Sequence, residues 1–211
     1  MVDQQEPGTA REQLLDAAER LIAERGTALP MRQVVVEAGQ RNNAAVRYHF
    51  GTRDELIAAI IERRQTSLER DRLALLAARE AKGHLGLRGL VEVLLEPVFK
   101  LQEKPGAGHH ARFMEKVRDY PGLVLYDRSD WPATSLIVSR IHQLFDNEPP
   151  PARAQRMRLV NAAVFSLLAE LERAEGGADG SERERMENMV IDMVVALMST
   201  ASTEREVGSA E

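Results

Sequence analysis

The stretch Ala38-Gly-Gln-Arg-Asn-Asn-Ala-Ala-Val-Arg-Tyr-His-Phe-Gly-Thr-Arg53 begins at a glycine turn and continues into a short segment with helical spacing. The segment before it, about 30–38, also fits a short helix, and Pro30 suits the first turn of such a helix. Two short helices that meet at a glycine-containing turn form a helix-turn-helix when small residues lie at their crossing. The stretch supplies them: Ala38, Gly39, Ala44 and Ala45. The sequence therefore predicts a helix-turn-helix whose second helix spans about 42–48.

Charge is distributed unevenly along the chain. The 211 residues hold 28 Lys and Arg against 33 Asp and Glu, which gives a net charge of −5. Residues 26–53, however, hold four Arg and one acid, and no acid lies between Ala38 and Arg53. A short basic and amide-rich stretch in an acidic chain is typical of a DNA-binding segment. On charge alone, the alternative is a chance gap between acids.

The polar side chains of this stretch are chemically suited to DNA. Asn can pair with adenine and Arg with guanine in the major groove, which favours Asn42, Asn43 and Arg47 as base-reading residues. Tyr, His and Arg side chains beside that helix can hold phosphates. The predicted DNA-binding residues are Gln40, Arg41, Asn42, Asn43, Ala44, Arg47, Tyr48, His49, Thr52 and Arg53.

Outside this stretch the sequence predicts helices throughout. Apolar residues recur with helical spacing, no segment alternates with a period of two, and capping boxes begin at Thr9, Thr52 and Ser181. The predicted helices span about 11–24, 30–38, 42–48, 53–80, 87–103, 109–120, 130–145, 152–174 and 182–200. Pro97 lies inside the fifth helix and is expected to kink or split it. The predicted fold is all-α, with about nine helices.

A longer ordered pattern covers about residues 9–61. It consists of Thr9-Ala-Arg-Glu-Gln-Leu-Leu-Asp-Ala-Ala-Glu-Arg-Leu-Ile-Ala-Glu-Arg-Gly26, then Met31-Arg32, Glu37-Ala38-Gly39 and Tyr48-His-Phe-Gly-Thr-Arg-Asp-Glu-Leu56. This pattern resembles the tetracycline-repressor (TetR) family of bacterial transcriptional regulators. The resemblance implies that Tyr48, His49 and Arg53 face the DNA backbone. It also implies a helix-turn-helix DNA-binding domain at 1–53 and a helical effector-binding and dimerisation domain at 54–211.

The chain departs from the family pattern around the turn. Gly39 and Phe50 are eleven positions apart, where ten are usual, so the turn or the recognition helix gains one residue. The set of base-facing side chains around Asn42 and Asn43 is therefore open to a shift of one position. Val35 replaces a small Ala, Pro30 replaces a Ser or Thr cap, and Arg53 replaces a Lys while keeping its charge.

Two apolar stripes near the end of the chain predict an interface between two copies. Two helices from each subunit would form a four-helix interface with two-fold symmetry, as the family resemblance also implies. The predicted interface residues are Val160, Val164, Leu167, Leu171, Met186, Val190, Met193 and Leu197. The alternative is that both stripes face only the core of their own chain.

Several of the chain's few aromatic residues fall between the fifth and eighth predicted helices. As a set they indicate an apolar, mid-sized ligand pocket, although each one alone is more typical of ordinary core. The predicted pocket residues are Phe99, His110, Phe113, Met114, Tyr126, Trp131 and Phe165.

Composition and missing motifs exclude several classes of protein. The chain has no Cys, which excludes disulfides, Cys-ligated zinc and a thiol nucleophile. It contains no G-x-S-x-G, P-loop or H-E-x-x-H motif and no His-x3-His spacing, so we expect neither an enzyme nor a metal site. The polar start and the short apolar runs predict no signal peptide and no membrane span. We expect a soluble, cytoplasmic protein without a cofactor, apart from an unidentified small-molecule effector.

The predicted function is that of a homodimeric, ligand-responsive transcriptional regulator that acts as a repressor. Each subunit would place the helix at 42–48 in the major groove of one half of a palindromic operator. The alternative from another class is a helical small-molecule-binding protein, or a degenerate enzyme, that binds no operator. An activator, or a regulator without a small ligand, fits the sequence as well, and the sequence names neither the effector nor the operator.

Overall fold

The computed structural model describes residues 9–42, 44–103, 107–120, 131–145, 149–174 and 180–200. Within these ranges the chain forms helices joined by short turns and contains no strand, which confirms the predicted all-α fold. The helices are α1 (Ala10–Arg25), α2 (Met31–Glu37), α3 (Ala45–Phe50), α4 (Arg53–Glu80), α5 (Leu87–Gln102), α6 (His110–Val117), α7 (Pro132–Gln143), α8 (Pro150–Ala174) and α9 (Gly180–Ser199).

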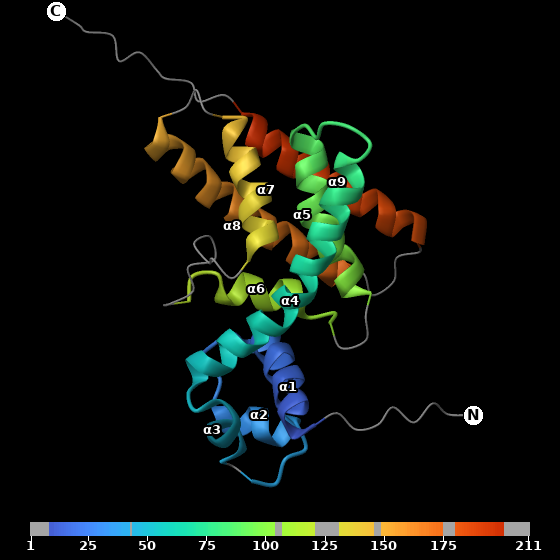
Figure 1. Cartoon of the computed structure of the whole chain (residues 1–211). Helices are drawn as coiled ribbons and strands as arrows, with labels where there is room; N and C mark the ends of the chain where they lie inside the picture. The colour runs from blue at the N-terminus through green and yellow to red at the C-terminus, as the bar shows by residue number, and fades with distance from the viewer. Residues whose placement is uncertain are drawn as a thin grey trace, which may run out of the picture.

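The N-terminal part is a small bundle of α1, α2, α3 and the start of α4, seen at the bottom of Figure 1. Its core contains fully buried side chains such as Leu14 and Ile22 of α1 and Val34 of α2. The first turns of α4 belong to the same core, since Leu56 and Ile60 are fully buried in it. The predicted division after residue 53 therefore falls at the start of a helix that serves both parts.

Two helix starts in this bundle follow the predicted caps. The Thr52 hydroxyl accepts a hydrogen bond from the Glu55 amide at 3.2 Å, and the Glu55 carboxylate accepts one from the Thr52 amide at 2.8 Å. Thr9 caps α1 by accepting from the amide of Glu12 at 3.3 Å. These contacts satisfy amides that an α-helix leaves without a partner at its first turn.

The boundaries predicted for the third helix were wrong. It begins at Ala45 and not at about residue 42, because the side chain of Asn42 accepts a hydrogen bond from the Ala44 amide at 2.9 Å. Such a side-chain turn competes with helical hydrogen bonding, so Asn42 lies in the turn that leads into the helix. The helix also runs beyond Tyr48 to Phe50 and ends at Gly51, whose φ of 76° suits glycine.

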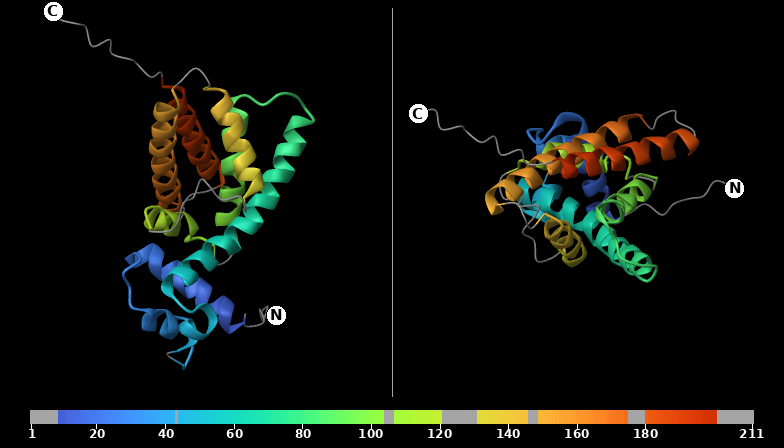
Figure 2. Two further views of the ribbon diagram at one scale, coloured as in Figure 1. Left: turned by 60° about the vertical axis from the view of Figure 1, so that its left-hand side comes forward. Right: turned by 90° about the horizontal axis from the view of Figure 1, so that it is seen from above.

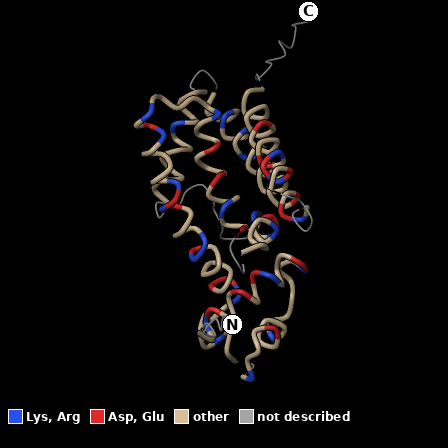
Figure 3. The backbone as a smooth tube through the Cα atoms, turned by 90° about the vertical axis from the view of Figure 1, so that its right-hand side faces the viewer, with Lys and Arg blue, Asp and Glu red and all other residues tan. Residues whose placement is uncertain are grey.

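The upper part packs five helices around a second core. The long helix α4 leaves the N-terminal bundle and joins α5, α7, α8 and α9, and Figure 2 shows α8 and α9 side by side on one flank. Helix α5 runs continuously from Leu87 to Gln102 with Pro97 inside it, so Pro97 does not split it. Acidic and basic residues are interspersed along the helices of this part (Figure 3).

Helix α6 lies across the middle of the molecule, between α1 below it and α8 (Figure 1). Its side chains enter both cores: Phe113 and Met114 pack with the N-terminal bundle, whereas Ala111 packs with the upper helices. A change in the position of α6 would therefore be felt in both parts.

Candidate nucleic-acid interface and ligand cavity

Helix α3 has one buried and one exposed face. Ala45, Val46 and Phe50 pack into the N-terminal core, while Arg47 and Tyr48 point outward, Tyr48 with 83% of its surface exposed. An aromatic side chain this exposed on a structured helix is unusual for a monomer surface and typical of a contact site. Its ring packs edge-on against the half-buried ring of His49, with 5.0 Å between the ring centres.

The turn before α3 adds further exposed polar groups. Arg41, Asn42 and Ala44 are exposed, as are Arg47 and Tyr48 of the helix that follows. The predicted contact Asn43 lies outside the described residues. The remaining three predicted contact residues also have partners within the protein.

Gln40, Thr52 and Arg53 hold the bundle together. The Gln40 amide donates to the side chain of Gln13 in α1 at 2.7 Å, and Thr52 caps α4. One terminal nitrogen of Arg53 donates to the carbonyl oxygen of Leu29 at 2.9 Å, while its Nε has no partner among the described residues. Arg53 is half-buried, and its hydrogen bond to Leu29, in the turn before α2, fixes the orientation of its guanidinium group.

A cavity of about 130 Å³ lies in the upper part, between α4, α5, α6, α7, α8 and α9. Four of the residues predicted for a pocket line it: His110, Met114, Trp131 and Phe165. Phe99 and Phe113 do not, because they are buried in the upper and N-terminal cores respectively. Tyr126 lies outside the described residues.

The polar lining of the cavity was missed by the sequence analysis. Gln65 and Arg72 of α4, Thr134 of α7 and Asn161 of α8 all line it. A signal was present in α4, where Gln65 and Arg72 recur at helical spacing with the buried Leu68 and Leu76. Polar residues at positions of a buried stripe indicate a polar site inside a core.

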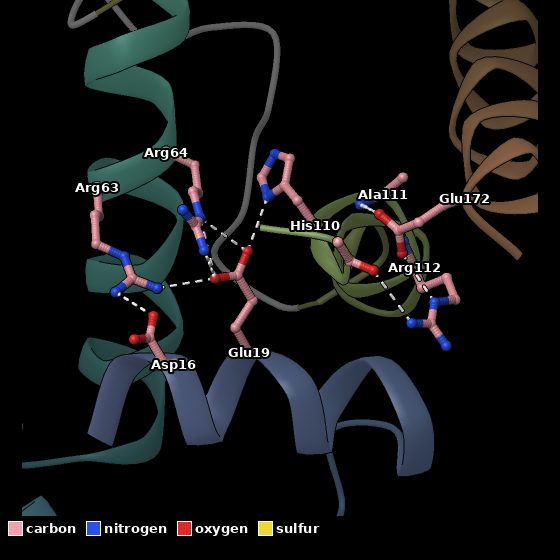
Figure 4. A network of polar contacts seen from close by, with 9 residues as sticks. Asp16, Glu19, Arg63, Arg64, His110, Ala111, Arg112 and Glu172 are labelled. Carbon is pink, nitrogen blue, oxygen red and sulfur yellow. Dashed lines mark hydrogen bonds and ion pairs between the residues drawn. The ribbon is translucent and has the colours of Figure 1, made fainter. Parts of the chain in front are cut away.

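A network of polar contacts surrounds Glu19 of α1, whose exposed fraction is 1% (Figure 4). Its carboxylate accepts hydrogen bonds from Arg63 at 2.8 Å and from Arg64 at 2.7 Å, both on α4. His110 Nδ1 of α6 lies 3.2 Å from the same carboxylate. Glu19 therefore joins α1, α4 and α6 at one point, and His110 also faces the cavity.

The surroundings of Glu19 favour its ionised form. Burial alone would raise the pKa of the carboxyl group, but the hydrogen bonds from His110 and Arg64 outweigh burial and lower the pKa to about 2. A buried carboxylate without such partners would be strongly destabilising, so the arrangement is specific to these three helices.

Two further contacts hold α6 in place. The buried carboxylate of Glu172 in α8 accepts hydrogen bonds from the Ala111 amide at 2.8 Å and from Arg112 Nε at 2.8 Å, at the first turn of α6. Beyond the other end of α6, the Tyr120 hydroxyl donates to Asp54 of α4 at 2.6 Å, which raises the pKa of Tyr120. Helix α6 is thus tied to the upper part at its start and to the base of α4 at its end.

The residues predicted for a dimer interface divide into two groups. Val160, Leu171 and Val190 are buried in their own chain, and Val164, Leu167 and Met186 pack partly against the same core. Met193 and Leu197 are exposed on α9, and Leu159 of α8 and Met189 of α9 are exposed apolar residues as well. The core takes one side of each helix, and a different apolar stripe stays exposed.

Among the described residues, no three His, Asp or Glu side chains come together in a way that could hold a metal ion. No helix in the described ranges has the length and the apolar character required to cross a membrane.

Comparison with known proteins places the exposed α3 surface in a family. Residues 14–60 match the sequence model of bacterial regulatory proteins, tetR family. No curated protein matches the chain. Two solved structures are similar: a TetR-family regulator from Streptomyces coelicolor A3, at 18% identity over 93% of this chain and 99% of that one with a TM-score of 0.39, and a candidate transcriptional regulator from Rhodococcus sp. RHA1, at 18% identity over 88% and 95% with a TM-score of 0.37.

The family assignment rests on the matched region. Residues 14–60 contain α2, the turn, α3 and the part of α4 that completes the N-terminal core. This is the complete helix-turn-helix together with the exposed surface described above, and the matched family is one of regulatory proteins. Residues 14–60 therefore form the DNA-binding helix-turn-helix region of the tetR family of bacterial regulatory proteins, which supports a DNA-binding transcriptional regulator.

Proposed function

We propose that the protein is a dimeric repressor that releases a palindromic operator when a small molecule binds in the cavity of the upper part. One observation carries this proposal: His110 lines the cavity and contacts Glu19, which is a residue of the DNA-binding bundle. A ligand that moves His110 acts directly on the contact that orients α1 against α4. The difference in ligand affinity between the two orientations then becomes a coupling free energy between the cavity and the operator.

The proposed DNA contacts divide by role. Arg47 on the exposed face of α3 reads a base edge in the major groove, and Arg41, Asn42, Asn43 and Ala44 flank it on the preceding turn. Tyr48, His49 and Arg53 hold phosphates, with Thr52 and Gln40 fixing the backbone around them. The proposed division into a DNA-binding domain, residues 1–53, and an effector-binding and dimerisation domain, residues 54–211, follows from this assignment.

The proposed dimer uses the outer faces of α8 and α9. Met189, Met193 and Leu197 follow one another at intervals of four residues, so they form one stripe on α9, and Leu159 lies exposed on the neighbouring α8. A two-fold axis through this stripe would pair it with its own copy. The two reading helices would then meet half-sites about one helical turn, roughly 34–36 Å, apart.

The experiment that tests the proposal is an operator selection with the full-length protein. A random DNA library is bound at moderate salt, and the retained sequences are aligned and then bound again in a gel-shift titration. We expect a near-palindrome, bound by two protein chains. Retained sequences without two-fold symmetry, or a complex with a single chain, would contradict the dimeric part of the proposal.

The ligand response is tested with the same operator. A compound that binds in the cavity should weaken operator binding by a factor of about 5 to 150, the usual range for coupled sites. The alternative of a helical carrier without operator binding is less well supported, because it leaves the exposed Arg47 and Tyr48 without a role. Failure of the full-length protein to retain any sequence above a random control would favour that alternative.

A further inference from the structure

The side chain of Arg72 combines deep burial with an unused hydrogen-bonding group. Only 7% of this residue is exposed, and it lines the cavity. Its Nε donates to the Leu94 carbonyl at 3.2 Å, and its Nη1 donates to Thr134 Oγ1 at 2.9 Å and Gln65 Oε1 at 3.1 Å. The hydrogen bonds of Arg72 to described residues all come from Nε and Nη1, and none comes from Nη2. Two N–H groups therefore remain for a molecule in the cavity.

A second donor lies beside Arg72. The Gln65 side chain uses its oxygen to accept from Arg72, and its amide nitrogen has no partner among the described residues. Gln65 also lines the cavity, and it lies two helical turns before Arg72 on the same face of α4. The two residues thus present a fork of N–H groups, which is the arrangement that binds the paired oxygens of a carboxylate.

The charge of Arg72 is not fully matched by the nearest carboxylate. Glu69 lies 3.5 Å from Arg72 Nη1, which is a long contact. Its two oxygens accept instead from the Ala133 amide at 2.7 Å, from the Thr134 amide at 3.2 Å and from the Thr134 hydroxyl, so Glu69 caps the start of α7. None of the described residues that line the cavity is an Asp or a Glu. Burial also lowers the pKa of Arg72, and an anion placed beside it would reverse that effect.

The remaining lining is apolar. Leucine, valine and methionine side chains of α4, α5, α8 and α9 form most of the wall, together with the rings of Trp131 and Phe165. The volume of about 130 Å³ is close to that of a cavity of about 150 Å³ that holds benzene in another protein. The space therefore suits a single ring or a short branched chain, and not a large polycyclic molecule.

We propose that the cavity binds a compact apolar acid, with one carboxylate held by Arg72 and Gln65 and a one-ring or short-chain body among the apolar side chains. This inference rests on the proposed ligand response, because it names the chemical class of the ligand for the same cavity. Binding of a carboxylate also gives a role to Arg72 inside the core, where a leucine would pack without the cost of desolvating a charge.

The single Trp of the chain makes the proposal directly measurable. Trp131 lines the cavity, so its fluorescence reports occupancy in the full-length protein without DNA. Benzoate and phenylacetate are titrated against benzamide and phenylacetamide, which have the same shape without the charge. We expect each acid to bind at least about tenfold more tightly than its amide, since a hydrogen bond to a charged group is stronger than a neutral one. Equal binding of acid and amide, or binding of neither, would overturn the proposal.

Variants test whether Arg72 and Gln65 cause the preference for the acid over the amide. Arg72→Met should bring the acid-to-amide ratio close to one, while Arg79→Met, which changes an arginine on the same helix that pairs with Glu92 and Glu96, should leave the ratio unchanged. Gln65→Leu should lower acid binding several-fold and keeps Arg72 in place, so it carries the test if Arg72→Met does not fold. An unchanged ratio in Gln65→Leu and in any folded Arg72→Met protein would contradict the proposed fork.

Operator binding, measured in parallel, separates this proposal from the ligand response itself. An acid that binds near Trp131 but leaves operator affinity unchanged would contradict the ligand response and support the chemical class. A neutral apolar compound that binds more tightly than the acids and releases the operator would contradict the class and support the response.

Discussion

At the scale of single residues, Glu19 shows how a charge can be kept inside a protein core. The residue lies on the apolar face of α1, between Ala18 and Leu21, where a leucine would be the ordinary choice. Its partners are 44, 45 and 91 positions away along the chain. A substitution that removes the carboxylate leaves two arginines facing one another, so Glu19 stabilises one particular packing of α1, α4 and α6.

The lowered pKa of Glu19 makes part of the stability depend on pH. Because the folded-state pKa is about 2 and the ordinary value is 4.5, this contribution is complete above about pH 5 and is lost as pH falls toward 2. Between pH 5 and pH 3 it amounts to about 2 kcal/mol. We expect the difference in unfolding free energy between the wild type and Glu19→Gln, measured by urea denaturation, to shrink by about this amount over that interval.

A matched control is available on the same helix. Asp16 also contacts Arg63, at 2.8 Å, but it is exposed, so Asp16→Asn should change stability by less than about 1 kcal/mol. A difference between wild type and Glu19→Gln that stays constant from pH 5 to pH 3 would show that the carboxylate is not held in its charged form.

The two arginines that we propose as DNA contacts, Arg47 and Arg53, should respond differently to truncation. Arg47→Ala removes a proposed base contact and should cost about 1–3 kcal/mol on the preferred sequence, with a loss of discrimination at one position of each half-site. Arg53→Ala removes a proposed phosphate contact and should weaken all sequences alike. It should also reduce the slope of log affinity against log salt by about one per subunit.

The control for Arg53 is Arg53→Lys, which keeps the charge and loses the hydrogen bond to Leu29. We expect its salt slope to match the wild type in gel-shift or anisotropy titrations from 50 to 200 mM salt, conditions under which phosphate contacts are well resolved. An unchanged slope in Arg53→Ala would remove the phosphate role from this residue.

At the scale of helices, the sequence predicted the presence of each helix better than the residues at which it begins and ends. The nine helices of the described residues were all expected, because hydrophobic spacing and capping boxes are local signals. The start of α3 was misplaced by three residues, since Asn42 can cap a turn or occupy a first helical turn and the choice depends on the packing of Ala45 and Val46. The uninterrupted α5 likewise depends on its buried neighbours, which hold the helix together around Pro97.

The position of α6 should depend on Glu172. This carboxylate accepts from the amides of Ala111 and Arg112, which the first turn of a helix leaves without partners. Glu172→Gln should therefore destabilise the protein by roughly 2 kcal/mol. We expect it to speed amide hydrogen exchange at residues 111–113 before it affects exchange in the rest of the upper part.

Glu170→Gln is the control for this variant. Glu170 lies on the same helix but is exposed and pairs only with Arg173 among the described residues, so its loss should leave the exchange of α6 unchanged. Unchanged protection of residues 111–113 in Glu172→Gln would mean that α6 is held by its apolar contacts alone.

At the scale of the whole molecule, the lining of the cavity and the exposed apolar stripe were the least predictable features from the sequence. Helical spacing assigns a residue to a buried face but does not say which other helix covers that face. The predicted pocket therefore included the core residues Phe99 and Phe113, and the predicted interface included Val160 and Val190, whose stripes the chain's own core occupies. The helix-turn-helix was predictable because its residues are consecutive, whereas the cavity is assembled from six helices.

The outer stripe of α9 provides the test of assembly. Met193 is 45% exposed in the single chain, so Met193→Glu should fold normally as a monomer. If the two-fold contact exists, the substitution places two carboxylates there, one from each chain, and their repulsion and desolvation oppose association. We expect light scattering after size exclusion to show a dimer for the wild type and a monomer for the variant. The control is Leu136→Glu, an exposed apolar residue on α7, which should remain dimeric.

Loss of the dimer should weaken binding to the operator. Two linked reading heads gain affinity because the second binds at a high effective concentration, so Met193→Glu should bind a full palindrome at least about 100-fold more weakly, yet bind an isolated half-site as the wild type does. A variant that is monomeric and still binds the palindrome with wild-type affinity would contradict the proposal that the two subunits of a dimer bind the two half-sites together. A variant that remains dimeric would show that the two chains meet elsewhere, and the exposed stripe of Leu159, Met189, Met193 and Leu197 would then need another partner.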